Sequence, residues 1–165
     1  MCLIVYNKQY AVATQDITVW KVVCTNGDAW IGPYMFDLTE FSFDSVIKPK
    51  GSAFANINIC KDVSGQTYYE INGGHFHSCE TEEECKNLLP YVMNYIDKAK
   101  KGIYGVRYGE VAMKYNLLKI CKCTIPAGTE LYTDGLYFAS KQLIVHKPKD
   151  CYCYTSDSPM VHTLE

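Results

Sequence analysis

Residues 73–85 read Gly-Gly-His-Phe-His-Ser-Cys-Glu-Thr-Glu-Glu-Glu-Cys and hold the start of the one helix that the sequence predicts clearly. Thr81 is followed three residues later by Glu84, which is the spacing of a capping box. The glutamates here place negative charge at the positive end of the helix dipole. Before them, His75 to Cys79 has the pattern of a short strand that follows a glycine turn. This stretch therefore predicts a strand-to-helix junction.

The predicted helix region covers residues 81–101. Its apolar side chains recur at helical spacing in Leu88, Leu89, Val92, Met93, Ile96 and Ala99. Lysines lie in the last turn, and Gly102 suits the left-handed conformation that ends many helices. Pro90 lacks a backbone N–H, so we expect a kink there or a second helix that begins with Pro90 in its first turn.

Strand patterns lie on both sides of this helix region. The segments with strand character are residues 17–24, 117–125, 130–132, 137–140 and 142–146. Residues 68–77 are predicted to form a hairpin, with Asn72-Gly73-Gly74 as its turn. The fold class is therefore α+β, with a mainly antiparallel sheet and one principal helix region packed against it. We expect a single domain over residues 1–150 and an irregular C-terminal tail over residues 151–165.

Length, charge and cysteine content restrict the class of protein. The chain has 165 residues, which suits one domain, and its net charge of −2 gives no electrostatic footprint for DNA or RNA. No apolar run approaches the roughly 20 residues of a membrane helix, so we expect no membrane partner. Nine cysteines are an odd number, and no export signal is seen, so we expect reduced thiols and a cytoplasmic protein.

Aromatic and basic residues provide the candidates for a ligand site. Arg107 is the single arginine among 16 basic residues, and arginine is the usual partner of phosphates and carboxylates. The chain also has 14 tyrosines, whose rings are suited to holding aromatic ligands. The predicted ligand-binding residues are Arg107, Tyr104, Tyr108, Tyr34, His75 and His77. The alternative is an ordinary surface arginine and tyrosines that belong to the core or to the sheet surface.

Two histidines and two cysteines raise the question of a metal. His75, His77 and Cys79 alternate along one predicted strand, and Cys85 follows in the first helical turn, so two nitrogens and two sulfurs could bind zinc. Their spacing matches no common zinc module. We therefore assign no cofactor and no catalytic residue, and keep zinc as an alternative to histidines that hydrogen-bond a loop.

Two fragments resemble enzyme families. Cys2, directly after Met1, resembles the amino-terminal nucleophile of class II glutamine amidotransferases, although Met1 precedes it here. The Gly73–Cys85 stretch resembles the middle of ADP-ribosyltransferase-type folds. That resemblance implies roles for His75 or His77, Ser78, and Glu110 or Glu130. The order differs from that family, because no histidine or arginine precedes the glycine turn.

A wider resemblance covers residues 1 to about 146. The chain resembles a family of small proteins from gut bacteria and their phages in Lys8, residues 13–23, Gly32-Pro33-Tyr34, residues 74–77 and residues 123–132. The resemblance implies a protein of phage or mobile-element type and supplies no catalytic residue.

These observations predict a binding protein. It would sequester a nucleotide-derived small molecule or mask a host protein, with a role against host defence and a location in the host cytoplasm. The alternative is an ADP-ribosyltransferase-like or metal-assisted enzyme that uses the His75–Cys79 strand. A structural or virion-associated oligomer is the second alternative, and the oligomeric state is left open.

Overall fold

The computed structural model describes residues 3–6, 10–33, 40–49, 57–71, 74–148, 152–155 and 158–163 of the chain. The strands before the helices are β1 (Leu3–Val5), β2 (Tyr10–Val12), β3 (Ile17–Thr25), β4 (Trp30–Ile31), β5 (Val46–Ile47), β6 (Ile57–Lys61), β7 (Thr67–Ile71) and β8 (Phe76–Cys79). The helices are α1 (Glu82–Lys100) and α2 (Val106–Lys114). They are followed by β9 (Leu117–Ile125), β10 (Glu130–Thr133), β11 (Tyr137–Ser140), β12 (Leu143–Val145), β13 (Tyr152–Thr155) and β14 (Ser158–Thr163).

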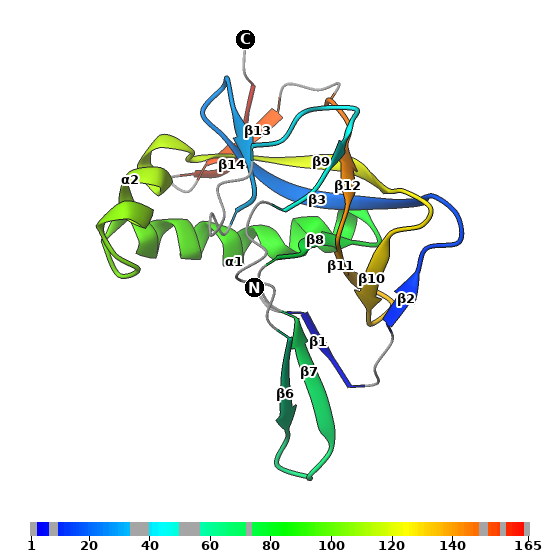
Figure 1. The fold of residues 1–165 in the computed structure, drawn as a ribbon. Helices are drawn as coiled ribbons and strands as arrows, with labels where there is room; N and C mark the ends of the chain where they lie inside the picture. Colours follow the sequence, from blue (N-terminus) through cyan, green and yellow to red (C-terminus); the bar gives the residue numbers. More distant parts are fainter. Residues whose placement is uncertain are drawn as a thin grey trace.

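The predicted α+β class is confirmed, with mainly antiparallel sheet. Most strands belong to an 11-stranded sheet with the central order β14-β13-β9-β3-β8-β11-β10-β2. Its centre is the long pair β3 and β9, which stays in register from Ile17 opposite Ile125 to Thr25 opposite Leu117. Figure 1 shows α1 running alongside β3 and β9 on one side of the sheet, with α2 beyond one end of α1, and β10 and β11 running across the direction of β3.

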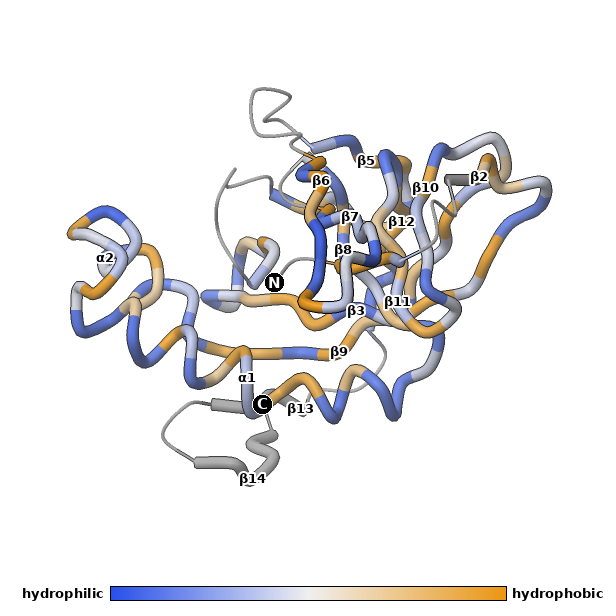
Figure 2. The backbone as a smooth tube through the Cα atoms, turned by 90° about the horizontal axis from the view of Figure 1, so that it is seen from below, coloured by the Kyte–Doolittle hydropathy of each residue, from blue (hydrophilic) through white to orange (hydrophobic). Residues whose placement is uncertain are grey.

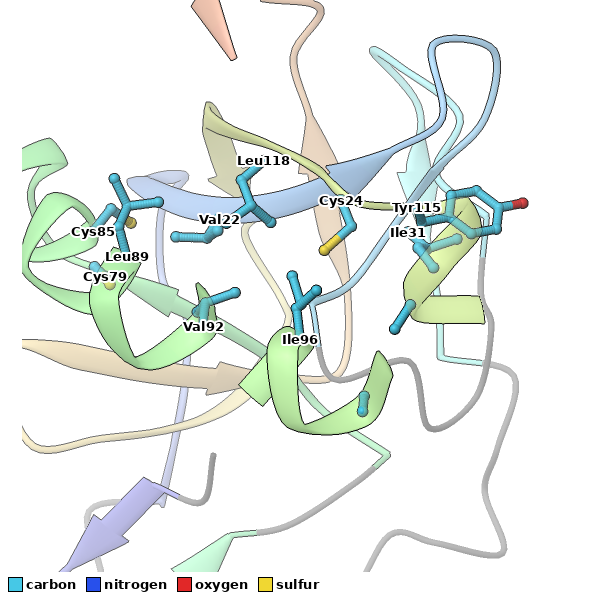
Figure 3. Packing of buried hydrophobic residues seen from close by; sticks show 12 residues of the cluster. Val22, Cys24, Ile31, Cys79, Cys85, Leu89, Val92, Ile96, Tyr115 and Leu118 are labelled. Carbon is cyan, nitrogen blue, oxygen red and sulfur yellow. The ribbon is translucent and has the colours of Figure 1, made fainter. Parts of the chain in front are cut away.

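The core has two parts because alternate residues of β3 and β9 face opposite sides of the sheet. One side packs against α1 and includes Val22, Cys24, Leu118, Leu89, Val92 and Ile96 (Figure 3). The other side is the inner face of the curved sheet and includes Val19, Val23, Cys121, Cys123, Phe41 and Phe76. Cys121 and Cys123 point to the same face as free thiols, as the two-residue spacing predicts.

The helix α1 follows its sequence signals at both ends. The Thr81 side chain accepts a hydrogen bond from the Glu84 backbone N–H at 3.2 Å, and Gly102 has a φ of 80° after the last turn. Hydrophobic and hydrophilic residues alternate along the helix in Figure 2, as a one-sided apolar stripe requires. The expected second helix start at Pro90 is wrong, because Pro90 lies inside one continuous helix, on its exposed side.

The predicted hairpin over residues 68–77 is also wrong. β7 pairs with β1 and β6 in a separate three-stranded sheet, whereas β8 pairs with β3 and β11. The glycine-rich turn therefore connects two sheets, and residues 72–73 lie outside the described part. Leu3, Val5 and Ile71 of the small sheet pack on Tyr132 and Ala139 of the large one.

Two further elements differ from the sequence expectations. α2 was not predicted, and its Gly109 lies so close to α1 that an added Cβ would be 3.0 Å from the Ala99 carbonyl oxygen. Residues 151–165 were expected to be irregular, but β13 and β14 form a hairpin, and β13 extends the large sheet by pairing with β9. Neither described helix has the length and apolar character needed to span a bilayer.

Candidate functional site

The predicted ligand residues Arg107, Tyr104 and Tyr108 lie together at the junction of α1 and α2. The Tyr104 ring stacks on Tyr95 of α1, with ring centroids 4.8 Å apart and an interplanar angle of 21°. Burial, followed by the neighbouring hydroxyls of Tyr104 and Tyr108, raises the pKa of Tyr95 to about 12. Arg107 is exposed in the first turn of α2. The sequence pattern therefore does correspond to one surface, which we call the α1–α2 end (residues 95–114).

This α1–α2 end also exposes large apolar side chains. Ile103 is 61% exposed, Val106 78% and Met113 67%. Val106 and Met113 are seven residues apart, so they lie on the same side of α2. Arg107 and Lys114 follow the same spacing along the adjacent edge of the helix. An apolar strip with a basic edge is therefore presented to solvent.

His75 and His77 are not part of that surface. They lie beside β8, next to the start of α1, whereas Arg107 lies beyond its end. The helix has 19 residues, or about 28 Å at 1.5 Å per residue. His75 is buried with its ring edge-on to Tyr132 at 5.9 Å, and His77 is half-buried opposite Ala139. The structure therefore does not bring the histidines and Arg107 together, and Tyr34 lies outside the described residues.

The zinc alternative receives no geometric support from the described residues. They contain no group of three or more His, Cys, Asp or Glu side chains arranged to hold a metal ion. Instead, Cys79 and Cys85 contact each other in the core beside Leu89 (Figure 3). A hydrogen bond from Cys85, and secondly the charge of Lys21, lower the pKa of the Cys79 thiol, while the same bond raises the pKa of Cys85.

The charge of Lys21 acts on both thiols of this pair. This lysine projects from β3 into the protein, and its Nζ donates to the His77 carbonyl oxygen at 2.6 Å. Burial lowers the pKa of Lys21, and the surrounding thiols, led by Cys123, only partly oppose that shift. Lys21 is only 6% exposed. The junction of β8 and α1 is therefore a polar region that is buried from solvent.

The residues that the ADP-ribosyltransferase resemblance selects are spread over the molecule. Ser78 is buried on β8, Glu110 is exposed on α2, and Glu130 is exposed at the start of β10. Glu110 lies at the same end of α1 as Arg107, away from the histidines. Cys2, the candidate amino-terminal nucleophile, lies outside the described residues.

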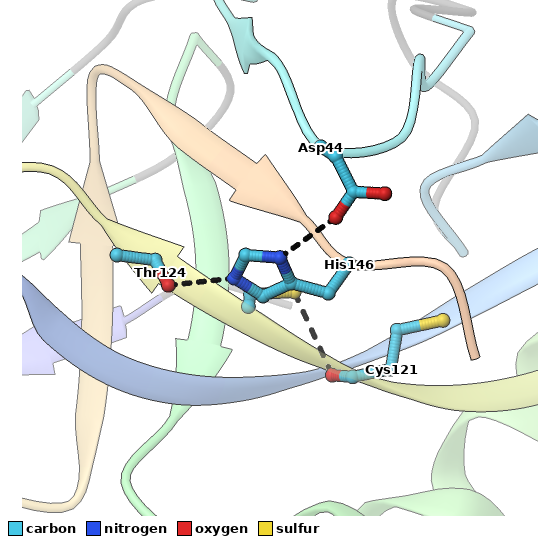
Figure 4. Close-up of polar contacts among 5 residues, drawn as sticks. Asp44, Cys121, Thr124 and His146 are labelled. Carbon is cyan, nitrogen blue, oxygen red and sulfur yellow. Dashed lines mark hydrogen bonds and ion pairs between the residues drawn. The ribbon is translucent and has the colours of Figure 1, made fainter. Parts of the chain in front are cut away.

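One group of functional side chains was not predicted from the sequence. His146 follows β12, and its Nδ1 lies 3.0 Å from Asp44 Oδ1, while its Nε2 lies 2.7 Å from Thr124 Oγ1 on β9 (Figure 4). These residues form an acid–imidazole–hydroxyl series on the outer surface of the sheet. Asp44 and His146 are 102 positions apart in the chain, and no local motif marks either of them. Strand pairing brings the three together: Val145 lies opposite Cys123, and a bridge between Phe43 and Val145 places Asp44 beside His146.

Comparison with known proteins adds no residue to these sites. No protein-family model, no curated protein and no solved structure matches the chain. The resemblance to small phage-type proteins therefore stays a prediction.

Proposed function

We propose that this chain is a binding protein that covers a surface of a partner protein with its α1–α2 end. The exposed strip of Ile103, Val106 and Met113 carries the proposal, because large apolar side chains gathered on one exposed surface mark interaction sites. Tyr104 and Arg107 border the strip, and aromatic residues, methionine and arginine are enriched where proteins meet. In a protein of phage type, the partner would be a host protein that is masked by the contact.

The charge around the strip defines the partner's chemistry. Lys98, Lys101, Arg107 and Lys114 are exposed around it, and Glu110 is the acidic residue between Val106 and Met113. A complementary partner presents an apolar centre with an acidic rim. Such a rim speeds association and makes it sensitive to salt, while the apolar contacts supply most of the affinity. The exposure of these side chains on a helix surface also suits a protein better than a small molecule, since small-molecule sites are usually concave.

Site-specific photo-crosslinking tests this proposal. A photoreactive residue at position 106 should capture one partner in the producing cell, and the same residue at Val46, an exposed strand position outside the α1–α2 end, should not. The captured protein is then purified, and its affinity is measured by calorimetry. Val106→Asp should weaken binding by at least about tenfold, as expected for the loss of a central apolar contact. A crosslink to a second copy of this chain would instead support the structural oligomer, and equal capture at both positions would contradict the proposal.

A nucleotide-derived ligand at the same end is the second candidate. α2 begins after Gly105 without a side-chain cap and with no acidic residue in its first turn. The first N–H groups of a helix lack intrahelical partners, so they favour an anion such as a phosphate. Arg107 would face the phosphate, and the exposed side of Tyr104 would stack on the base. ADP should then bind more tightly than adenosine, and Arg107→Ala should abolish the difference; equal affinities would remove this candidate.

A further inference from the structure

We propose that Thr124, His146 and Asp44 form an acyl-transfer site, in which Thr124 Oγ1 is the nucleophile, His146 the general base and Asp44 a positioning residue. The substrate class is a small activated ester. The site lies on the outer surface of β9 and β12, so the inference is independent of the binding proposed for the α1–α2 end. The inference depends on two hydrogen bonds that meet at one imidazole.

The arrangement of donors and acceptors gives each atom a role. A carboxylate only accepts hydrogen bonds, so the neutral imidazole of His146 carries its proton on Nδ1 and donates it to Asp44 Oδ1. The lone pair of Nε2 then faces Thr124 Oγ1 at 2.7 Å, within the range in which a base removes a hydroxyl proton. The same order of acid, imidazole and hydroxyl activates serine nucleophiles on unrelated folds.

Backbone contacts hold the three side chains in place. The His146 N–H donates to the Lys122 carbonyl oxygen at 3.0 Å, which fixes the imidazole two residues from Thr124 along β9. The Asp44 N–H donates to the Val145 carbonyl oxygen at 2.9 Å. Asp44 has a φ of 57° and is the one non-glycine residue with positive φ in the part of the chain that the structure describes. Residues held in this region often occur at functional sites, where the surrounding structure maintains them.

The site is open to a substrate from solvent. The His146 side chain is 38% exposed and that of Asp44 63%, while Thr124 is half-buried. Lys122 is exposed and occupies the same face of β9 as Thr124, because side chains two apart on a strand share a face. A positive charge on this face favours the oxyanion that develops during attack on a carbonyl group.

The proposed step is balanced. Thr124 Oγ1 forms a bond to the acyl carbon, the hydroxyl proton passes to His146 Nε2, and the bond between the acyl carbon and the leaving oxygen breaks. The imidazolium then returns the proton to the leaving alkoxide, which departs as an alcohol. Water attacks the resulting threonine ester by the same route and regenerates the hydroxyl group. The products are one carboxylic acid and one alcohol.

An alkyl fluorophosphonate is the probe for the nucleophile. Attack by Thr124 Oγ1 forms an oxygen–phosphorus bond and releases fluoride, and the modified peptide is located by mass spectrometry. We expect labelling at Thr124 in the wild type and unchanged labelling in Thr18→Val, since Thr18 lies directly opposite Thr124 on β3 and is exposed. His146→Gln should lower the labelling rate at least about 100-fold, as expected for loss of a general base. Absence of label from Thr124 in the wild type, or equal rates in His146→Gln, would overturn the proposal.

Asp44→Asn tests the positioning role separately. Asparagine matches aspartate in shape and tolerates positive φ, so the backbone can be kept. Its amide can donate to Nδ1, which favours the tautomer with the proton on Nε2 and removes the lone pair from Thr124. We expect the ¹⁵N chemical shifts of the His146 ring to report this tautomer change and labelling of Thr124 to fall with it. A purely structural aspartate would leave both the tautomer and the labelling rate unchanged in the folded variant.

Discussion

At its N-terminal end, α1 is capped by Thr81 and packs Cys85 against Cys79 in a buried region that also contains Lys21. At its C-terminal end, the same helix leads through Gly102 into α2, where Arg107 is exposed to solvent. Both ends contain polar residues, and for that reason the sequence predicted a site at each. They differ in burial: the first end is buried and the second is exposed.

Burial changes what a polar group does. Burial lowers the pKa of Lys21 beside the β8–α1 junction. It also raises the pKa of the Cys24 thiol, farther along β3, to about 12, so both groups are biased towards their neutral forms. A charged side chain at the α1–α2 end keeps its hydration and can exchange water for a partner. We therefore expect substitutions at the first end to change stability and its pH dependence, and substitutions at the second end to change binding.

The largest loss of stability is expected between the two ends, where α1 packs against the sheet. Ile96 is fully buried against Cys24 and its neighbours (Figure 3). Ile96→Ala should lower the free energy of unfolding by about 2–5 kcal/mol, because it removes apolar contacts and leaves a cavity. Urea denaturation measures the change. Tyr91→Ala on the exposed side of the same helix is the control and should stay within about 0.5 kcal/mol of the wild type.

Lys21→Met should change the pH dependence of stability. The folded-state pKa of Lys21 lies below its ordinary value of 10.5, so between these two values the unfolded chain binds more protons and stability rises with pH. Buried thiols such as Cys24, with a raised pKa, act in the opposite direction. Removing the lysine should therefore leave a free energy of unfolding that falls more steeply, or rises less, as pH increases towards 10.5.

The measurement for Lys21→Met is a set of urea denaturation curves across the alkaline range below pH 10.5, compared with the wild type. Lys122→Met is the matched control, because Lys122 is exposed and lies opposite Trp20 on the neighbouring strand. Its curve should run parallel to that of the wild type. A parallel curve for Lys21→Met as well would mean that burial does not shift this lysine.

Local signals in the sequence were enough to predict the elements whose formation depends on residues close together in the chain. The cap at Thr81, the stripe along α1 and the strands β10 and β11 were all predicted and are all present. The incorrect predictions concern which elements pair or pack with each other. The predicted turn at residues 72–74 falls partly outside the described residues, and β7 and β8 do not pair with each other but with strands far away in the chain. α2 was missed because Gly109 lowers its helix propensity, although this glycine is what lets α2 approach α1.

The same difference between local and long-range contacts explains which parts of the candidate sites could be predicted. Arg107 and Tyr104 are close in sequence, so their proximity could be predicted. The stacking of Tyr104 on Tyr95 could not be predicted, because it depends on how the chain turns back after α1. The series from Asp44 to Thr124 could not be anticipated at all. It depends on β12 pairing with β9, and a scattered histidine carries no information about which hydroxyl it will reach.

A smaller effect on stability is expected from the cap itself. Thr81→Ala removes the acceptor for the Glu84 N–H and should lower the free energy of unfolding by about 1 kcal/mol. Thr81→Ser keeps the hydroxyl group and should restore nearly all of that loss. Urea denaturation again gives the comparison. Equal losses in both variants would indicate that the methyl group of Thr81, and not its hydrogen bond, stabilises the start of α1.

The smallest effect on stability, and the sharpest test of the contrast, is expected for Arg107→Ala. The side chain is exposed, and no ion pair joins it to another described residue, so the free energy of unfolding should change by less than about 0.5 kcal/mol. Affinity for the crosslinked partner should nevertheless fall, and the remaining affinity should depend less on salt, because one contact to the acidic rim is lost. A folded variant with unchanged affinity and unchanged salt dependence would restrict the proposed contact to the apolar strip. A large loss of stability would instead mean that Arg107 helps to hold α2 against α1, and the two ends of the helix would then differ less than their exposure indicates.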